Sequence, residues 1–165
     1  MFKWLEMTRC GAGINRFHTT PVIGDPQSVA SHSFGVAMLA LFLEPDLATM
    51  NLIKAALYHD LAEQVTGDVP AHVKWENPAV KASLLEVEKR FEIEWNLDIK
   101  LTQYEQNVLR WADMLELLFY CKEQRMLGNK NMDHIFARGS ESLSTLPAHE
   151  KGQELLNYLQ ETYNE

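Results

Sequence analysis

The residues of this sequence that could carry chemistry interrupt its most apolar segments. His32 lies in one such segment and Asp113 in another, while His59 and Asp60 interrupt the segment between them. Glu63 follows His59 by four residues, which places both side chains on one face of a helix. A buried imidazole or carboxylate needs a partner, a metal ion or a shifted pKa, because removing it from water alone costs several kcal/mol. These five residues are therefore candidates for a functional site.

Metal binding is the chemistry that these side chains favour. The imidazoles of His32 and His59 and the carboxylates of Asp60 and Asp113 would form a mixed nitrogen and oxygen ligand set. Such a set suits a divalent transition ion (Mn, Co, Fe, Ni or Zn) better than a calcium site, which is built from oxygen ligands. The residues alone leave other interpretations open. A histidine on an apolar helix can be a satisfied core residue, and Asp113 can pair with Arg110 on its own helix.

Helices are expected to position these side chains, because apolar residues recur at helical spacing through most of the chain. Segments 28–43 and 51–65 are apolar nearly all round, which predicts two helices in the middle of the domain. Weaker helical patterns occupy 3–9, 132–138 and 149–163. Alternating β-branched runs bounded by turn residues are missing. We therefore predict an all-α fold, a compact helical bundle with the metal site between its central helices.

Two further helices carry clear start signals. Asn77-Pro78 predicts an N-cap followed by proline at the first helical position. Thr102 to Glu105 matches a capping box, and Gly128 is expected to end the helix that follows. The apolar stripe expected on the first of these helices consists of Val80, Leu84, Val87, Phe91 and Trp95.

Length and composition indicate one globular domain over residues 1–165, since a domain typically has ~150 residues. Fifteen Lys and Arg against 23 Asp and Glu give a formal charge of −8, which argues against nucleic acid as a partner. The longest apolar run, 36–43, is too short to span a membrane. The two cysteines form no CxxC pair and no secretory signal is visible, so we expect a cytoplasmic location.

Four short motifs follow one another along the chain: Ser31-His32-Ser33, His59-Asp60, Thr66-Gly67-Asp68-Val69-Pro70 and Ala112-Asp113. In this order they resemble the HD-domain phosphohydrolases, and specifically the bacterial 5′-deoxynucleotidase branch. The segment from Tyr58 to Lys74 is similar to the signature of that branch. Asn15-Arg16-Phe17 resembles its Arg-Trp pair, with Phe in place of Trp. The resemblance covers residues 10 to 130, approximately.

The resemblance implies a role for each matching residue. A divalent transition ion, with Co, Mn or Zn expected, would be held by His32, His59, Asp60 and Asp113. The attacking water would be positioned or deprotonated by the catalytic residues Glu63 and Asp68, which could also hold a second ion such as Mg through water. Phosphate oxygens would be neutralised by Arg16 and Lys74, and the nucleobase or sugar would stack on Phe17. Gly67, without a Cβ, fits a turn that directs Asp68 toward the metal.

For the substrate-binding residues, simpler interpretations stay open. Arg16 can pair with Asp25 at the surface, Lys74 can be merely solvated, and Phe17 can belong to the core. The C-terminal apolar residues are ambiguous in the same way. The related enzymes are homo-oligomers, which we also expect here, and an interface or the chain's own core would be covered by Leu155, Leu156, Leu159 and Tyr163.

The family resemblance implies hydrolysis of a small-molecule deoxynucleotide at its 5′ phosphate. The chain is short for the nucleotidase branch, since His32 precedes His59 by only 27 residues and Asp60 precedes Asp113 by 53. This compactness is similar to the small HD-domain dATP triphosphohydrolases of phages that exclude adenine from their DNA. We therefore expect a dNTP triphosphohydrolase that acts on dATP. We expect it in the cytoplasm of a bacterial cell, where a phage could encode it. A 5′-deoxynucleotidase acting on dNMPs is the alternative.

Two other functions are less consistent with the residues. Hydrolysis of a cyclic nucleotide or a guanosine alarmone would call for additional histidine ligands, and the remaining histidines do not lie at helical spacing from the core set. A non-catalytic module with a structural ion would not need Glu63 and Asp68.

Overall fold

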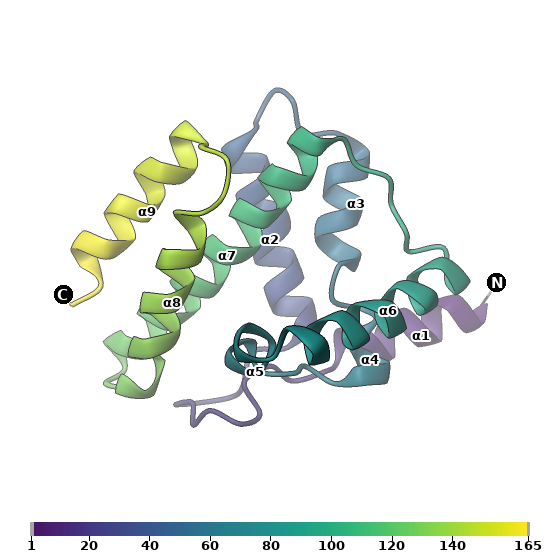
Figure 1. The fold of residues 1–165 in the computed structure, drawn as a ribbon, viewed down its shortest axis with the longest axis horizontal. Coiled ribbons are helices and arrows are strands. Elements are labelled where there is room, and N and C mark those ends of the chain that lie inside the picture. Colours follow the sequence, from purple (N-terminus) through teal and green to yellow (C-terminus); the bar gives the residue numbers. More distant parts are fainter. Residues whose placement is uncertain (1, 165) are drawn as a thin grey trace.

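The computed structural model describes residues 2–164, apart from the side chains of residues 71 and 72, and over this range the chain is helical with no β-strand (Figure 1). The predicted all-α fold class is therefore confirmed. None of the described helices is both long enough and apolar enough to cross a membrane. In chain order the helices are α1 (Phe2–Ala12), α2 (Val29–Leu43), α3 (Met50–Tyr58), α4 (Glu63–Thr66), α5 (Ala71–Glu76), α6 (Pro78–Glu94), α7 (Gln103–Met126), the 3₁₀ turn η1 (Lys130–Met132), α8 (Asp133–Leu143) and α9 (Glu150–Thr162).

The long helix α7 forms the centre of the fold. It packs against α2 and α3, and on its other side against α8 and α9 (Figure 1). The main core lies between these helices and includes fully buried Trp111, Leu115 and Leu118 of α7. A smaller core joins Val29 at the start of α2 to residues beside α4 and after α6. Because α2 contributes to both cores, it links the two ends of the molecule.

Local signals determine where the central helices begin and end. The Ser28 hydroxyl accepts a hydrogen bond from the Ser31 N–H at 3.2 Å, which caps α2. Thr102 and Glu105 form the predicted capping box at the start of α7. Gly128 has a φ of +92° just after α7, a conformation that glycine adopts without steric cost. These boundaries match the sequence predictions.

The second apolar segment is not the single helix predicted over 51–65. α3 ends at Tyr58, and the chain continues through tighter turns before α4 begins at Glu63. In these turns the Leu61 N–H bonds to the Tyr58 carbonyl at 3.0 Å, and the Glu63 N–H bonds to the Asp60 carbonyl at 3.1 Å. Such bonds span three residues instead of four and tighten the helix. The motif His59-Asp60 therefore lies in a turn between two helices.

Helix α2 is central but is not covered all round as predicted. Its inner face packs on α7 and α3 through small residues such as Ala37 and Ala40. Its outer face exposes Phe34, Met38 and Phe42 by 63%, 51% and 56%. These three residues recur every fourth position and form one stripe, which we call the α2 ridge. The prediction was wrong because apolar composition does not reveal how many neighbouring helices are available to cover a helix.

The predictions for α6 were correct in where the helix starts and in which side chains it turns inward. Proline occupies the first turn as expected, but the Asn77 side chain donates to the Val73 carbonyl at 3.2 Å and makes no cap hydrogen bond. No residue of α6 itself is fully buried, but Phe91 packs against the small core, and Trp95, directly after the helix, belongs to it. α6 packs mainly on the short helices α4 and α5 across the outer end of the molecule. Of its predicted stripe only Val80 is exposed, while Leu84, Val87 and Phe91 are half-buried. The six-residue helix α5 was not predicted at all.

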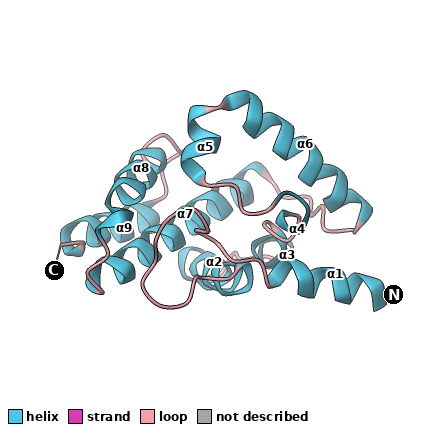
Figure 2. Cartoon of the chain, turned by 90° about the horizontal axis from the view of Figure 1, so that it is seen from below, coloured by secondary structure: helices cyan, strands magenta, loops and turns pink. Residues whose placement is uncertain are grey.

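The long loop between α1 and α2 is fastened to α7 at its far end (Figure 2). The Gln124 side chain accepts from the Ile23 N–H at 2.8 Å and donates to the Ile23 carbonyl at 3.0 Å. Asn129 donates to the Pro21 carbonyl at 2.8 Å. Both amides are buried, so these bonds hold the loop in one conformation. The loop carries Arg16 and Phe17.

Candidate active site

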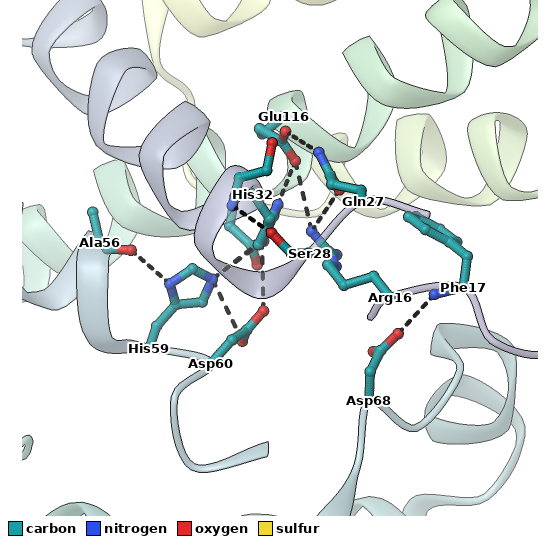
Figure 3. A network of polar contacts seen from close by, with 12 residues as sticks. Arg16, Phe17, Gln27, Ser28, His32, Ala56, His59, Asp60, Asp68 and Glu116 are labelled. Carbon is teal, nitrogen blue, oxygen red and sulfur yellow. Dashed lines mark hydrogen bonds and ion pairs between the residues drawn. The ribbon is translucent and has the colours of Figure 1, made fainter. Parts of the chain in front are cut away.

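Four predicted metal ligands converge on one point from three parts of the fold, and three of them, His32, His59 and Asp60, are labelled in Figure 3. His32 comes from α2, His59 and Asp60 come from the turn after α3, and Asp113 comes from α7. His32 Nε2 lies 3.0 Å from Asp113 Oδ1, 3.3 Å from His59 Nε2 and 3.6 Å from Asp60 Oδ2. His59 Nε2 lies 3.4 Å from Asp60 Oδ1. The sequence prediction that these side chains meet is thus reproduced in the geometry.

The Nδ1 atom of each imidazole makes a hydrogen bond outside the proposed metal site. His59 Nδ1 donates to the Ala56 carbonyl at 2.8 Å, and His32 Nδ1 donates to the carboxylate of Glu116. These partners assign the proton of each neutral ring to Nδ1, so both Nε2 atoms present lone pairs to the same point. Two lone pairs 3.3 Å apart beside two carboxylates repel one another unless a positive charge lies between them.

The donor set fits a transition metal ion. Nitrogen and oxygen ligands bind such ions at about 2.0–2.2 Å, so ligand atoms around one ion lie about 3–3.5 Å apart. One ligand atom from each of His32, His59 and Asp113 lies within 4.8 Å of the other two, and Asp60 lies beside both imidazoles. The nearer pairs match the spacing that an ion requires. Hydrogen bonds from the outer ring nitrogens to a carbonyl and a carboxylate are also typical of metal-binding histidines.

The pKa values of the histidine and aspartate side chains also show that this site favours positive charge. Burial lowers the pKa of His59, but the carboxylates of Asp60 and Asp113 outweigh burial and raise it to about 9. Burial raises the pKa of Asp113, but hydrogen bonds to the two histidines outweigh this and hold it well below its usual range. Without an ion, the site therefore takes up protons in its place.

A cavity of about 140 Å³ opens beside these four residues. Its lining includes Asp60 and Asp113 together with further charged side chains and several apolar ones. The remaining polar lining residues are Arg16, Thr19, Thr20, Glu63, Asp68 and Lys74, and the apolar ones are Phe17, Val69, Pro70, Trp75, Met114, Leu117 and Ile135. The cavity thus brings together the predicted catalytic and substrate-binding residues.

Glu63 is buried beside the ligand set, with 5% of its surface exposed. Its Oε1 lies 3.6 Å from Lys74 Nζ on α5, while its Oε2 has no hydrogen-bond partner among the described residues. Burial, followed by the carboxylates of Asp60 and Asp68, raises the pKa of Glu63 to about 9. Lys74 is therefore not merely solvated, and a free carboxylate oxygen faces a site lined by acids.

Asp68 lies after the turn that ends α4. Gly67 has a φ of +72°, as the sequence predicts for a residue that reverses the chain there. Asp68 lines the cavity, and its Oδ2 accepts the Phe17 N–H at 3.0 Å. Phe17 itself has a φ of +59°, a rare conformation for a bulky residue that costs about 1–3 kcal/mol. Asp68 thus helps to hold a strained segment at the cavity wall.

Arg16 is not a surface residue paired with Asp25. Only 11% of its side chain is exposed, and its Nη1 lies 3.6 Å from Glu116. Its Nε is buried without a hydrogen-bond partner among the described residues. The Phe17 ring stacks on Tyr120 at 4.8 Å between centroids, so it packs against the core while it also lines the cavity.

Two residues of this network, Glu116 and Gln27, were not predicted from the sequence (Figure 3). Glu116 contacts His32, Gln27 and Arg16 from α7. Its signal was present, because Glu116 interrupts an apolar run three residues after Asp113, as the other candidates interrupt theirs. Gln27 gave no such signal, since it lies in a polar loop.

Comparison with known proteins places this geometry in a family. The family model described as 5′-deoxynucleotidase YfbR-like matches residues 12–101, more than half of the chain. The 5′-deoxynucleotidase yfbR of Photorhabdus temperata is 25% identical over 72% of this chain and 72% of its own. The matched range contains all the candidate residues named above except those of α7.

Two solved structures share the fold over nearly their whole length. The PH0347 protein from Pyrococcus horikoshii OT3 is 25% identical, with a TM-score of 0.77, and 98% of this chain covers 99% of it. The cyanophage S-2L HD phosphohydrolase DatZ, bound to dA and one catalytic Zn²⁺ ion, has a TM-score of 0.70 over 96% of this chain and 95% of its own. At 20% identity, the second likeness is one of fold. The chain is therefore an enzyme of the HD-domain phosphohydrolases and belongs to the YfbR-like 5′-deoxynucleotidase family.

Proposed function

We propose that the chain hydrolyses deoxynucleotides at the 5′ phosphate, with a divalent transition ion held by His32, His59, Asp60 and Asp113. The observation that carries this proposal is the meeting of two imidazole lone pairs and two carboxylates at the wall of a cavity. When bound, such a cation screens the charge of a phosphoryl group and lowers the pKa of water that it binds. Co, Mn and Zn suit this ligand set, and Asp68 could hold a second ion such as Mg through water.

Glu63 and Asp68 act on the attacking water in this proposal. The free Oε2 of Glu63 is an acceptor that faces the cavity, so it can orient a water molecule and take its proton. Burial and the neighbouring carboxylates raise the pKa of Glu63 to about 9, and Lys74 at 3.6 Å acts in the opposite direction. A cation bound beside Asp60 would lower this pKa further, toward the ionised form that a base requires. Asp68 shares the cavity wall, while one of its oxygens holds the Phe17 backbone.

Arg16, Lys74 and Phe17 bind the nucleotide. The buried Nε of Arg16 is a donor without a partner among the described residues, and a phosphate oxygen would satisfy it. Lys74 lines the same cavity and would stabilise charge that develops on the phosphoryl oxygens. The exposed edge of Phe17 offers an apolar contact for the sugar or base.

We infer that the preferred reaction converts dATP to deoxyadenosine and triphosphate. In this reaction and in dNMP hydrolysis, water attacks the same phosphorus, the bond to the 5′ oxygen breaks, and that oxygen takes up a proton. The substrates differ only in the phosphates attached to that phosphorus. The short spacing of the motifs supports the triphosphate, as does a basic groove that continues from the cavity.

The basic groove has a volume of about 430 Å³ and shares Lys74 and Trp75 with the cavity. Lys81 of α6 and Arg138 of α8 line it further out, with Glu141 as its acidic residue. In a chain of net charge −8, three cations around one groove provide a favourable place for two additional phosphates. The alternative, hydrolysis of dNMPs, is supported by the name of the family and of the relatives.

Substrate pools supplied separately test both reactions. Purified protein would be incubated with Mn²⁺, Co²⁺ or Zn²⁺ and single dNTPs or dNMPs, and the products separated. Deoxyadenosine with triphosphate identifies the first reaction, and deoxynucleoside with inorganic phosphate identifies the second. Consumption of neither pool under any metal would overturn the proposed function.

We further propose that residues 1–165 form a single domain that assembles as a homo-oligomer. The single domain is supported by α2, which contributes side chains to both cores. Assembly is supported by the α2 ridge and by an adjoining apolar groove of about 330 Å³ that includes Phe119 and Leu155. The other C-terminal apolar residues, Leu156, Leu159 and Tyr163, are buried within the chain's own core.

A further inference from the structure

Glu116 is a buried carboxylate whose two oxygens serve different partners. It lies on α7 three residues after Asp113, and 8% of its surface is exposed. One oxygen, Oε2, accepts the Nδ1 proton of His32, while the other, Oε1, accepts from Gln27 Nε2 at 2.7 Å (Figure 3). A buried carboxylate is tolerated only where such donors satisfy it. Its location is therefore determined by both partners together.

Through Gln27, the Oε1 atom of Glu116 is connected to Arg16, which lines the cavity. Gln27 Oε1 accepts from Arg16 Nη1 at 3.3 Å, and the same Nη1 lies 3.6 Å from Glu116 Oε2. Glu116, Gln27 and Arg16 thus form a closed ring of contacts (Figure 3). The backbone reinforces this ring, because the Arg16 N–H bonds to the Gln27 carbonyl at 2.8 Å.

Helix α2 is shaped to admit the Glu116 side chain. Gly35 lies one turn after His32 and faces α7. A Cβ at Gly35 would lie 2.7 Å from Glu116 Cγ and 3.0 Å from Glu116 Oε1. Because a real Cβ essentially never lies that close, the carboxylate can occupy this place only while residue 35 is glycine. The packing therefore supports the location of Glu116 independently of its hydrogen bonds.

We propose that Glu116 is a positioning residue that couples the metal site to the phosphate-binding arginine, with Gln27 as the relay. The inference rests on the proposed function in that it gives His32 to the ion and Arg16 to the substrate. Through Oε2, Glu116 fixes the His32 ring and raises its basicity toward an ion. Through Oε1 and Gln27, it fixes the guanidinium of Arg16. The ion and the nucleotide are then each bound better when the other is present.

Three variants separate the two connections. Glu116→Gln alters both, Gln27→Leu breaks only the relay, and Glu123→Gln removes an exposed carboxylate from the same helix as the control. The affinity for Co²⁺ alone is measured by titration of its visible absorption spectrum. The affinity for dAMP and for dATP is measured by calorimetry, and KM and kcat are measured wherever turnover occurs.

If Glu116 couples the metal site to Arg16, the three variants should differ in Co²⁺ affinity and in nucleotide binding. Glu116→Gln lowers Co²⁺ affinity about 10–100-fold and changes the Co²⁺ spectrum. Gln27→Leu leaves Co²⁺ affinity within about twofold, but it weakens nucleotide binding and raises KM about 10-fold with little change in kcat. Glu123→Gln changes none of these. Because the Co²⁺ measurement needs no turnover, it tests Glu116 even if no nucleotide is hydrolysed and the proposed function fails.

A second pair of variants keeps the proposal testable if Glu116→Gln does not fold. Gly35→Ala displaces the Glu116 carboxylate and should also weaken Co²⁺ binding, whereas Gly13→Ala, whose new Cβ meets only atoms at 3.6 Å, should not. Unchanged Co²⁺ affinity in folded Glu116→Gln, or in folded Gly35→Ala, would overturn the proposal. Equal loss in Glu123→Gln would overturn it as well, because the effect would then be one of net charge.

Discussion

At the scale of single residues, chemistry could be anticipated from residue type and surroundings. His32, His59 and Asp113 were predictable as ligands because each interrupts an apolar segment, and the structure brings their donor atoms within 4.8 Å of one another. The same logic would have found Glu116. Gln27 could not be found, because its role depends on a loop that folds back onto α7. Arg16 Nε and Glu63 Oε2 are buried with no hydrogen-bond partner among the described residues, and this result of packing could not be predicted from the sequence.

Glu63 provides the sharpest residue-scale prediction. Glu63→Gln should lower kcat by about 10²–10⁴-fold, because the amide cannot accept a proton from water. The free energy of unfolding should not fall, since one oxygen of the buried native carboxylate has no hydrogen-bond partner in the part of the chain that the structure describes. Turnover, bound metal and thermal unfolding would be measured beside Glu86→Gln, an exposed residue of α6. Unchanged turnover would remove Glu63 from the mechanism.

Proton binding at the site predicts how stability depends on pH. In the metal-free protein the pKa of His59 is raised to about 9, so its stabilising contribution is complete below pH 6.5 and is lost as pH rises toward 9. The pKa of Glu63 is also raised to about 9, so between pH 4.5 and 9 the folded state holds a proton that the unfolded state has lost. Both groups make stability fall as pH rises.

We therefore expect the Tm measured in EDTA to decrease between pH 6.5 and 9. A bound ion replaces these protons, so the rise in Tm caused by Co²⁺ should grow over the same range. Calorimetric scans with EDTA and with Co²⁺ at each pH make the comparison. A metal-free Tm that is constant or increases between pH 6.5 and 9 would contradict this account of the site.

At the scale of elements, helix ends were predictable and helix surroundings were not. The capping box of α7 and the Ser28 cap of α2 depend on residues within one turn, so the sequence contains the whole signal. The break between α3 and α4 and the exposure of α6 depend on neighbours far away in the chain. The break between α3 and α4 is important for the site, because it places His59 and Asp60 in a turn and not within a helix.

The groove between α6 and α8 yields an element-scale prediction. In the double variant Lys81→Gln, Arg138→Gln, kcat/KM for dATP should fall about 10-fold, since each lost charge weakens binding of the outer phosphates by about 0.5–1 kcal/mol. Hydrolysis or binding of dAMP, which has no outer phosphates, should change little. Lys54→Gln, an exposed lysine of α3, is the control. An equal loss for dATP and dAMP would exclude the groove as a site for the outer phosphates.

At the scale of the whole molecule, an acidic chain places four of its cations beside the carboxylates of one cavity and the groove next to it. The formal charge is −8, yet Arg16, Lys74, Lys81 and Arg138 line the cavity or the groove beside it. Apolar residues at helical spacing predicted the all-α class, and charge and composition argued against nucleic acid as a partner. It could not predict the α2 ridge, because exposure depends on how the helices are distributed around α2.

The α2 ridge predicts the behaviour of the molecule in solution. Phe42→Glu should shift an oligomer toward monomer, because a charge would be buried without a partner in the interface. Size-exclusion chromatography with light scattering measures the change, and Leu85→Glu, at an exposed apolar residue of α6, is the matched control. A wild-type chain that is monomeric at every concentration, or an equal shift in both variants, would rule out this interface.

The central claim is that His32, His59, Asp60 and Asp113 share one cation. Anomalous X-ray diffraction from crystals grown with Zn²⁺ or Mn²⁺ tests it most directly. We predict an anomalous peak between the four side chains, about 2.0–2.2 Å from His32 Nε2 and His59 Nε2 and in contact with both carboxylates. An empty position in the presence of saturating metal, or a peak bound by other residues, would contradict the claim.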